Sequence, residues 1–313
     1  MVEAKSLFMN YGTTRALVDV SFVAEKNQVT GLLGPNGAGK TTCMKIITTQ
    51  IVPTSGTATV EGIDILEDPI EVRKRVGYLP ETAPLYNDME VVEYLDFVGK
   101  GRGLENHHLR TRIDWVVEAC KIKSVYRRPV GELSRGFRQR VGLAQALIHD
   151  PEVLIMDEPT SGLDPLQIVG IRQLIKELSA TKTIIFSTHI LQEVEAISDR
   201  IVIINEGKII ALGTPDELRL TAGDLPAFTL ELKATREAVE SSFNDSDPGL
   251  NLDFVGDSDD FSRFVISGSD FEKTRVLISD KVRDEGWQIR EFSPNVPSLE
   301  RAFIRLTKER VEQ

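Results

Sequence analysis

The alternation of hydrophobic and polar residues along the first part of the chain predicts short strands separated by helices. Strands are expected at Leu7–Tyr11, Leu17–Val23, Val29–Leu33, Thr57–Val60, Arg75–Leu79, Val153–Met156, Thr183–Ser187, Ile201–Asn205 and Lys208–Leu212. Helices are expected at Cys43–Ile47, Ile70–Lys74, Val91–Val98, His108–Cys120, Arg135–Ile148, Pro165–Ser179 and Ile190–Ile197. This order favours an α/β fold around a parallel sheet that helices cover. Strand signals vanish between about residues 83 and 150, which indicates an inserted helical subdomain.

A second pattern begins near Pro226. The elements expected beyond it are a strand at Phe228–Leu232, a helix at Arg236–Phe243, strands at Leu252–Val255 and Phe261–Ile266, a helix at Phe271–Glu285 and a strand at Gln288–Phe292. This βαββαβ order is typical of a small α+β unit of the ferredoxin-like kind. A last amphipathic helix carries Leu299, Phe303 and Leu306 on one face. We therefore expect two domains, residues 1–222 and residues 226–313.

Composition narrows the class of protein. The chain has 313 residues, of which 41% are hydrophobic and 27% charged, and this suits a globular protein of one large or two ordinary domains. The net charge of −11 argues against sequence-independent nucleic-acid binding, which needs a basic face. The longest apolar runs, such as Ile201–Ile204, are too short to span a bilayer, and the first residues lack a signal-peptide pattern. We expect a cytosolic protein in which Cys43 and Cys120 are reduced and packed in helices.

One glycine-rich stretch carries the strongest chemical signal. It reads Gly34-Pro35-Asn36-Gly37-Ala38-Gly39-Lys40-Thr41-Thr42 and fits the phosphate-binding pattern G-x-x-x-x-G-K-[ST] between an expected strand and an expected helix. Glycines let successive N–H groups point at an anion, and the helix adds its positive N-terminal end. In this pattern Lys40 reaches the β- and γ-phosphates, and the Thr41 hydroxyl ligates Mg²⁺. The alternative is a glycine-rich turn before an ordinary helix, but a chance match in such a chain is on the order of one in a hundred.

A pair of carboxylates follows one of the apolar strands. Asp157 and Glu158 come directly after Val153–Met156. Asp157 at a buried strand end suits Mg²⁺, held directly or through water, and Glu158 is placed to polarise the attacking water as general base. Taken alone, an Asp-Glu pair in this position is usually just the end of a strand. Downstream of a phosphate-binding loop in an alternating sheet, the catalytic interpretation is favoured.

One histidine has a similar placement. His189 follows the strand Thr183–Ser187, so we expect it on the same edge of the sheet, where it can donate a hydrogen bond to the γ-phosphate. A lone histidine is more often structural than catalytic. The other histidines, His107, His108 and His149, have no such placement, and we expect them at the surface.

The segment Leu133-Ser134-Arg135-Gly136-Phe137-Arg138-Gln139-Arg140 opens a helix with a serine cap. Because it precedes an Asp-Glu strand in a chain with a phosphate-binding loop, it resembles the signature motif of ATP-binding cassette (ABC) ATPases. Further landmarks fit that family: Tyr11-Gly12 resembles the loop whose aromatic ring stacks on adenine, Ser161-Gly162-Leu163-Asp164 resembles the D-loop, and His189 resembles the switch histidine. The resemblance covers about residues 3–220.

The sequence departs from the family pattern at two positions. Glu81 stands where the family usually has glutamine, and Arg135 stands in the signature motif where many members have glycine. At both positions the residue resembles that of one subgroup of the family, the ATPases that power bacterial type-2 exporters, including drug, lipid and gliding-motility systems. The segment Pro297–Phe303 resembles, more loosely, the small C-terminal accessory domain that is common in that subgroup.

The resemblance implies a P-loop ABC ATPase cassette, with a mixed sheet core, a β-subdomain and an inserted helical subdomain, that works as a dimer around two ATP molecules. Gly34–Thr42 of one subunit then faces Ser134 and Gly136 of the other, and Ser161 and Asp164 of the D-loop lie at the dimer contact. The catalytic residues implied are Lys40, Glu158 and His189, the adenine contact is Tyr11, and the Mg²⁺ ligands are Thr41, Glu81 and Asp157.

A separate partner in the membrane is also implied. The chain has no expected membrane span, so the transport path must belong to another polypeptide, a permease contacted through about Glu81–Tyr94. The protein would then lie on the inner face of the cell membrane, as the subunit that binds and hydrolyses ATP for an exporter.

Two other classes of function compete with this interpretation. Soluble ABC ATPases that act on DNA carry a long coiled-coil insertion and those that act on ribosomes carry two cassettes in one chain, and neither feature is present in this sequence. A nucleotide-gated regulator that binds ATP without turnover is disfavoured by the intact Glu158 and His189.

Overall fold

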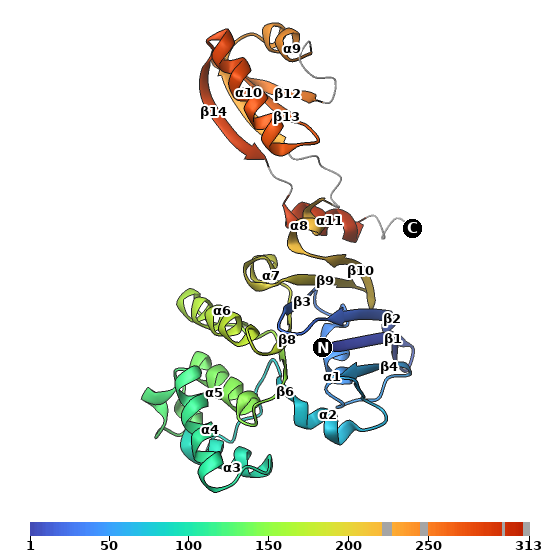
Figure 1. Cartoon of the computed structure of the whole chain (residues 1–313), viewed down its shortest axis with the longest axis vertical. Helices are drawn as coiled ribbons and strands as arrows, with labels where there is room; N and C mark the ends of the chain where they lie inside the picture. Colours follow the sequence, from blue (N-terminus) through green and yellow to red (C-terminus); the bar gives the residue numbers. More distant parts are fainter. Residues whose placement is uncertain (221–226, 245–249, 296–297, 309–313) are drawn as a thin grey trace. The chain divides into compact units, whose positions relative to one another are not determined.

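The computed structural model describes residues 1–220, 227–244, 250–295 and 298–308. The chain forms two compact units, Met1–Pro215 and Asp216–Gln313 (Figure 1). The domain junction expected at residues 222–226 lies outside the described residues, as does Pro297 of the segment that resembles an accessory domain.

A six-stranded sheet forms the centre of the first unit. Its strands, in spatial order, are β10 (Lys208–Gly213), β9 (Arg200–Asn205), β3 (Val29–Leu33), β8 (Thr183–Thr188), β7 (Val153–Asp157) and β6 (Val76–Leu79). The strands from β9 to β6 run parallel, and β10 returns antiparallel after a tight turn at Glu206 and Gly207, both with positive φ. Every residue of β3, β7 and β8 is buried, because both faces of this sheet are covered. The expected α/β fold is confirmed.

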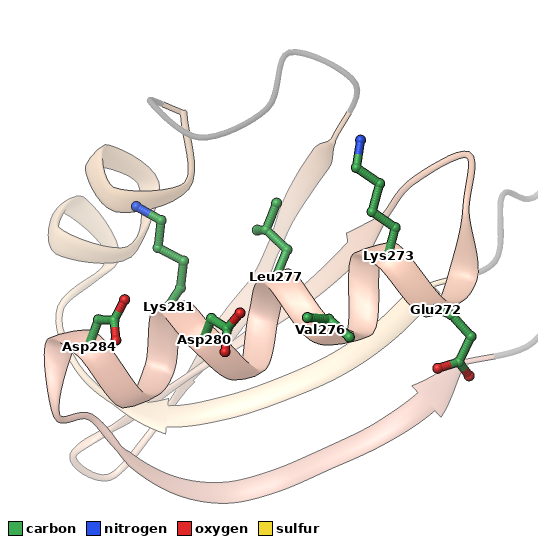
Figure 2. A pocket seen from close by; sticks show the side chains of 7 residues that line it. All are labelled: Glu272, Lys273, Val276, Leu277, Asp280, Lys281 and Asp284. Carbon is green, nitrogen blue, oxygen red and sulfur yellow. The ribbon is translucent and has the colours of Figure 1, made fainter.

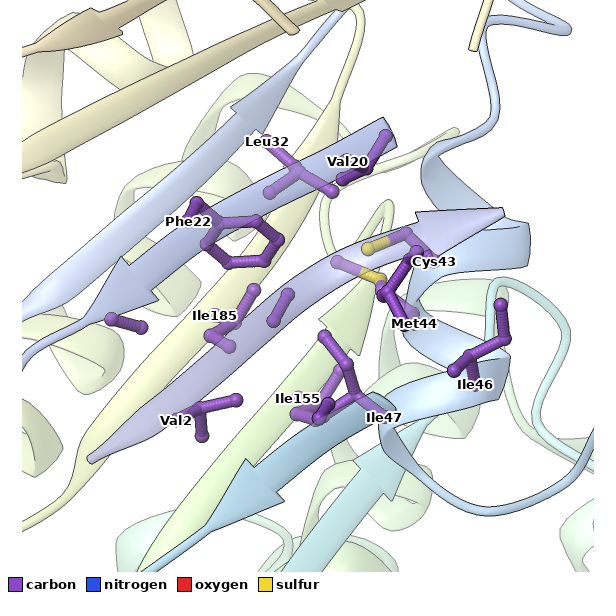
Figure 3. Close-up of a cluster of buried hydrophobic side chains, with 14 of the residues drawn as sticks. Val2, Val20, Phe22, Leu32, Cys43, Met44, Ile46, Ile47, Ile155 and Ile185 are labelled. Atoms are coloured by element: carbon purple, nitrogen blue, oxygen red, sulfur yellow. The ribbon is translucent and has the colours of Figure 1, made fainter. Parts of the chain in front are cut away.

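A smaller antiparallel sheet shares its core with helix α1 (Lys40–Ile47). Its strands, in spatial order, are β2 (Thr14–Ala24), β1 (Val2–Tyr11), β4 (Ser55–Val60) and β5 (Ile63–Asp64). Figure 3 shows its apolar side chains meeting those of α1 and of the main sheet; the core includes Val2, Val20, Phe22, Leu32, Cys43, Met44, Ile46, Ile47, Ile155 and Ile185. The helix that follows the glycine-rich loop is therefore held between two sheets, which fixes the loop.

The remaining helices of this unit are α2 (Pro69–Arg75), α3 (Val91–Gly101), α4 (Asn106–Ala119), α5 (Arg135–Leu147), α6 (Pro165–Ser179) and α7 (Leu191–Ile197), with short 3₁₀ turns at Lys123–Val125 and Val130–Glu132. Helices α3, α4 and α5 follow β6 and precede β7 in the sequence (green in Figure 1). They pack through fully buried side chains such as Leu95, Val116 and Leu143. Arg112 of α4 donates hydrogen bonds to the carbonyl oxygens of Leu147 and Ile148, which satisfies the end of α5.

Beyond a short helix at Pro215–Leu220 that the sequence pattern did not predict, the second unit has the expected order of helices and strands. Its helices and strands are α8 (Pro215–Leu220), β11 (Ala227–Lys233), α9 (Arg236–Asn244), β12 (Asn251–Ser258), β13 (Phe261–Ser267), α10 (Phe271–Glu285), β14 (Gln288–Asn295) and α11 (Leu299–Lys308). The sheet order β12-β13-β11-β14 with antiparallel neighbours is that of a ferredoxin-like unit. Its core includes Phe228, Leu230, Val239, Phe264, Ile266 and Ile278.

Both cysteines are free and fully buried, as expected. Cys43 lies in α1 and Cys120 directly follows α4. Burial raises the pKa of each thiol to about 12, so neither is a nucleophile near neutral pH. Within the described residues, no helix combines the length and the apolar character needed to cross a membrane.

One histidine corrects an expectation. His107 and His108 are exposed as expected, but His149 is not a surface residue, because its ring is largely buried with Nε2 3.1 Å from the carbonyl oxygen of Val76. Burial, reinforced by the nearby cations of Arg102, Lys182 and Arg112, lowers the pKa of His149 to about 4. The contact comes from a strand distant in the sequence, which the local pattern does not reveal.

Candidate functional site

The carboxyl ends of neighbouring parallel strands bring the sequence-predicted site residues to one edge of the main sheet. Leu33 of β3 pairs with Thr188 of β8, and Asp157 of β7 pairs with Ser187 of β8. Leu79 of β6 pairs with Met156 of β7. The glycine-rich loop, His189, the Asp157–Glu158 pair and Glu81 therefore leave four adjacent strands at the same edge, which is where open α/β sheets bind ligands.

The glycine-rich loop leads into α1 with unpaired backbone donors. Gly39 is the N-cap of α1 and has φ +106°, and no side chain caps the helix. The first hydrogen bond of the helix runs from the Cys43 N–H to the Gly39 carbonyl oxygen, at 2.9 Å. The N–H groups of Lys40, Thr41 and Thr42 thus precede the helical hydrogen bonds and stay available to an anion.

Glycine is required at two positions of the loop because other backbone passes close by. A Cβ at Gly34 would lie 2.1 Å from the Ile204 carbonyl oxygen, and one at Gly39 would lie 2.6 Å from the Ala16 carbonyl oxygen. Any larger residue would push the loop away from β9 or β2. The pattern of glycines is therefore also a packing requirement of this loop.

Lys40 lies inside this loop. Only 5% of the residue is exposed, and its ammonium donates hydrogen bonds to the carbonyl oxygens of Gly34, at 2.7 Å, and Pro35, at 3.0 Å. Burial lowers the pKa of the Lys40 ammonium. The carboxylates of Glu158, Asp157 and Glu81 oppose that shift, so all three lie close enough to act on its charge.

Asp157 and Glu158 are held by one serine that the sequence pattern did not single out. Ser187 of β8 is fully buried, and its hydroxyl donates a hydrogen bond to Asp157 Oδ1. The Glu158 N–H lies 3.1 Å from Ser187 Oγ and 3.2 Å from the Ser187 carbonyl oxygen. Glu158 has φ +47°, an unusual backbone conformation for a residue other than glycine. Its Oε1 lies 2.9 Å from His189 Nδ1.

Tyr11 ends β1 at the hairpin that leads into β2. It pairs with Thr14 across the hairpin and is 48% exposed, so its ring is available to a ligand. Ala16 of the same hairpin approaches Gly39 of the loop. The structure thus brings the hairpin that carries Tyr11 to the glycine-rich loop.

The signature segment contacts the D-loop of the same chain. Ser134 is exposed and caps α5, with its Oγ 3.4 Å from the Phe137 N–H. Arg135 Nη2 lies 3.3 Å from Ser161 Oγ, and a Cβ at Gly162 would meet the Arg135 guanidinium at 2.3 Å. The departure from the usual glycine therefore gives this chain a link between α5 and the D-loop.

The neighbouring residues of these two segments are also in contact or capped. A Cβ at Gly136 would lie 2.3 Å from the side chain of Gln167, so α5 approaches α6 closely there. Asp164 caps α6 by accepting a hydrogen bond from the Gln167 N–H at 2.9 Å. The contacts described above join α5, α6 and the D-loop within one chain; they involve Ser134, Arg135, Gly136 and Asp164.

The segment Glu81–Tyr94 carries one exposed aromatic side chain, Tyr86, and one buried one, Tyr94. Tyr86 is 55% exposed, and its ring makes edge-on contacts with Tyr94, at a centroid distance of 6.1 Å, and with Phe97, at 5.6 Å. Phe97 is itself half exposed. We call Tyr86, Tyr94 and Phe97 the aromatic cluster. Tyr94 is buried, but the exposed rings of Tyr86 and Phe97 suit contact with another protein.

The residues at the sheet edge fit a nucleoside triphosphate with Mg²⁺. The available N–H groups of α1 and the buried ammonium of Lys40 suit phosphate oxygens. Asp157 is only 2% exposed and supplies a carboxylate, while the exposed Thr41 supplies a hydroxyl, and Mg²⁺ prefers such hard oxygen donors. Ser187 orients the carboxylate through one of its oxygens.

The second unit has a hollow of about 660 Å³ on the outer face of α10, but its lining lacks this chemistry (Figure 2). The lining residues are Glu272, Lys273, Val276, Leu277, Asp280, Lys281 and Asp284. All the described lining residues come from the one helix α10, and among them no glycine-rich loop presents backbone N–H groups to a ligand. Its lysines and carboxylates alternate on an exposed surface, which is typical of a solvated helix face.

Comparisons with known proteins show which family this chain resembles. A family model described as "ABC transporter" matches residues 17–161. The chain is 41% identical to the "ABC transporter ATP-binding protein NatA" of Bacillus subtilis (strain 168), over 65% of this chain and 84% of that protein. It is 31% identical to the "Linearmycin resistance ATP-binding protein LnrL" of the same organism, over 98% of both chains. A solved structure described as "Structure of ATP binding subunit of ABC transporter" superposes with a TM-score of 0.66 at 31% identity, covering 71% of this chain and 93% of that one.

Proposed function

Because the chain belongs to the ABC transporter family, as an ATP-binding subunit with ATPase activity, we propose that it drives a separate membrane permease and that this permease is an exporter. The observation that carries this proposal is the convergence of the glycine-rich loop, Asp157, Glu158 and His189 on one edge of three adjacent parallel strands. Similarity over nearly the full chain to a linearmycin resistance protein supports outward transport.

Binding rests on the loop Gly34–Thr42 in this proposal. Its N–H groups and the Lys40 ammonium hold the β- and γ-phosphates, and the ring of Tyr11 stacks on the adenine. Thr41, Asp157 and Glu81 would hold Mg²⁺. When bound, the metal ion neutralises charge on the phosphates.

Glu158 acts as general base in this proposal. It accepts a proton from the attacking water, and its backbone is held by Ser187 so that the carboxylate keeps its direction. The hydrogen-bond distance between Glu158 and His189 supports a joint role, in which His189 orients the carboxylate with one ring nitrogen and has the other available for the γ-phosphate.

The active form is a dimer in this proposal. Ser134 and Gly136 of one subunit complete the phosphate site of the other, and the D-loop residues Ser161 and Asp164 lie at the contact between subunits. The exposure of Ser134 at the positive end of α5 supports this assignment, because that end suits a phosphate brought by a partner.

The permease contacts the segment Glu81–Tyr94 in this proposal, which places the protein on the cytoplasmic side of the cell membrane. The exposed rings of Tyr86, inside this segment, and of Phe97, just after it, support this contact. Residues 83–150 act as the helical subdomain that transmits movement, and residues 226–313 as an accessory domain without chemistry of its own. The net charge of −11 disfavours a nucleic-acid partner.

The experiment compares membrane association of two variants in cells that express the chain with its native permease. Tyr86→Ser combined with Phe97→Ser should release the protein from the membrane fraction while its ATPase activity in solution stays within about twofold of wild type. Val276→Ser, another exposed apolar position, is the matched control and should stay membrane-bound. Equal membrane binding by both variants would contradict the assigned contact segment.

A further inference from the structure

A buried carboxylate lies between the two loops that carry Glu158 and His189. Glu193 of α7 is only 2% exposed. The Thr160 hydroxyl donates a hydrogen bond to its Oε1, and the Thr188 hydroxyl donates one to its Oε2 at 2.6 Å. Both threonines are also buried, at 5% and 2% exposure. One side chain therefore connects the end of β8 with the loop after β7.

The cost of burying this carboxylate shows that its hydrogen bonds matter. A charged oxygen removed from water is strongly unfavourable unless protein donors replace the lost water. Hydroxyl groups that bond a carboxylate make short and strong contacts, and here each oxygen has its own donor. Glu193 is consequently sensitive to the position of both threonines.

Each threonine is tied to a residue of the proposed catalytic pair. Thr160 lies two residues after Glu158, in a turn closed by the Ser161 N–H, which is 3.1 Å from the Glu158 carbonyl oxygen. Thr188 directly precedes His189, and its Oγ1 also accepts the Ile190 N–H at 3.0 Å. The Thr188 hydroxyl, which bonds Glu193, therefore fixes the chain both before His189 and after it.

We propose that Glu193 is a positioning residue that holds the Glu158 loop and the His189 loop in register by bridging Thr160 and Thr188. The inference rests on the proposed function, in which Glu158 is the general base. Glu193 is buried and bonds both threonine hydroxyls, so in this proposal it acts through them. Its effect passes through the distance between His189 Nδ1 and Glu158 Oε1, 2.9 Å in the structure.

The hydrogen bonds of Glu193 can be removed by substitutions that hardly change the size of the side chains. Glu193→Gln keeps the size of the side chain, but the amide has one acceptor oxygen, and its NH₂ group cannot accept from a hydroxyl. Thr160→Val and Thr188→Val each remove one donor at nearly constant volume, whereas Thr160→Ser and Thr188→Ser keep it. Glu195→Gln changes an exposed residue of the same helix and serves as control.

In steady-state hydrolysis by the full chain, Glu193→Gln and both valine variants should lower kcat by about tenfold or more, since small displacements of a catalytic group have large effects on rate. The Kd for ATP should stay within about twofold, because the phosphate-binding loop is untouched. The serine variants and Glu195→Gln should keep near wild-type kcat. Losses of kcat that merely follow a lower melting temperature, or valine variants as active as serine variants, would overturn the proposal.

A double variant separates this proposal from the function on which it rests. In the Glu158→Gln background, single-turnover hydrolysis should fall by no more than about twofold further on adding Glu193→Gln, because the group being positioned is gone. A full additional loss would show that Glu193 acts elsewhere and overturn the positioning role. If Glu158→Gln alone keeps wild-type turnover, the assignment of the general base fails, which is a separate result.

Discussion

His189 Nδ1 lies 2.9 Å from Glu158 Oε1, although the two residues are separated by α6 and β8 in the sequence. The backbone brings the two residues together, because each follows the end of one of two adjacent parallel strands, β7 and β8. Glu158 adopts a left-handed conformation that Ser187 supports through the Glu158 N–H. The Glu158 carboxylate contacts His189 from this unusual backbone conformation.

Glu158→Gln should abolish most turnover and leave ATP binding intact. Loss of a general base typically lowers the rate by about 10²–10⁴-fold, whereas the phosphate-binding loop is unchanged. Steady-state hydrolysis and nucleotide titration measure the two effects, and an ATP-bound dimer should accumulate in size-exclusion chromatography. Glu177→Gln, on the exposed face of α6, is the control. Near-normal hydrolysis by Glu158→Gln would remove this residue from the mechanism.

Lys40→Ala should weaken ATP binding itself. Removing a buried ammonium that bonds phosphate oxygens typically costs about 1.5–3 kcal/mol, which corresponds to roughly tenfold to hundredfold in Kd. Lys45→Ala removes a charge from the last turn of the same helix and should leave Kd unchanged. Titration with a fluorescent ATP analogue compares the two. An unchanged Kd for Lys40→Ala would contradict the assignment of the phosphate site.

Ser134→Arg should spare ATP binding by the isolated subunit but block closure of the dimer. Ser134 is exposed at the start of α5, where we propose that only the nucleotide of the opposite subunit reaches it. Light scattering with ATP in a Glu158→Gln background measures dimer formation. Ser134→Ala is the control for size and should dimerise more readily than Ser134→Arg. Normal dimer formation by Ser134→Arg would count against a site shared between subunits.

Mixing two defective chains tests the same model by activity. In a heterodimer of Ser134→Arg with Lys40→Ala, both lesions fall on one composite site and the other site is intact. Some hydrolysis should therefore return on mixing if the two sites work independently. The hydrolysis rate of the mixture is compared with the rate of each variant alone, which forms only homodimers.

Asp150→Asn should reduce stability in a pH-dependent way. Asp150 Oδ1 lies 2.8 Å from Lys182 Nζ and 3.3 Å from Arg112 Nη2. Burial alone raises the pKa of Asp150, but the hydrogen bond and charge of Lys182, together with Arg112, bring it below its ordinary value. A carboxyl with a lowered pKa stabilises the fold above its unfolded pKa, and this contribution disappears as the pH falls through the folded value.

The Asp150→Asn protein should accordingly melt at a lower temperature at neutral pH and approach wild type in acid. Because the Asp150 side chain is 59% exposed, solvent screens its ion pairs, and we expect a loss of at most about 1 kcal/mol. Asp96→Asn, which breaks the exposed pair with Lys100, is the control and should have a smaller effect. A difference in melting temperature that does not change with pH would contradict the role of the charge.

Local sequence signals predicted much of this fold, and their failures have physical causes. The bounds of α6 are those expected, because Asp164 caps the helix, Pro165 begins it and apolar residues then recur at helical spacing. Strand β1 begins earlier than expected at Val2, because Ser6 has φ +46° and the pairing register shifts beside it, which interrupts the alternation.

The site was predictable to the extent that its residues sit in contiguous motifs. The glycine-rich loop and the Asp157–Glu158 pair are readable because each lies at a strand end beside the other motifs. Glu193 and Ser187 were not found, because a glutamate in a helix and a serine in a strand carry no local mark of burial. Their partners come from strands distant in the sequence, and only the assembled sheet reveals them.

The last prediction concerns the C-terminal unit. A chain that ends at Gly223 should stay soluble and bind ATP with a Kd within about twofold of the full chain, because every proposed nucleotide residue lies upstream. The unit has its own core, which includes Phe228, Phe264 and Ile278, and this supports independent folding. Dimer formation or coupling to the permease should change instead.

The competing view is that α11 packs on the cassette and makes the C-terminal segment essential to its stability. Leu299 and Ala302 of α11 are fully buried, yet neither belongs to the core around β11–β14, so the partner of this helix decides between the two views. Thermal melting of the truncated chain tests this directly, and Leu299→Ser in the full chain tests the helix alone. If α11 stabilises the cassette, both changes should lower its melting temperature and truncation should weaken ATP binding. An insoluble truncated chain, or one unable to bind ATP, would rule out an accessory role for residues 226–313.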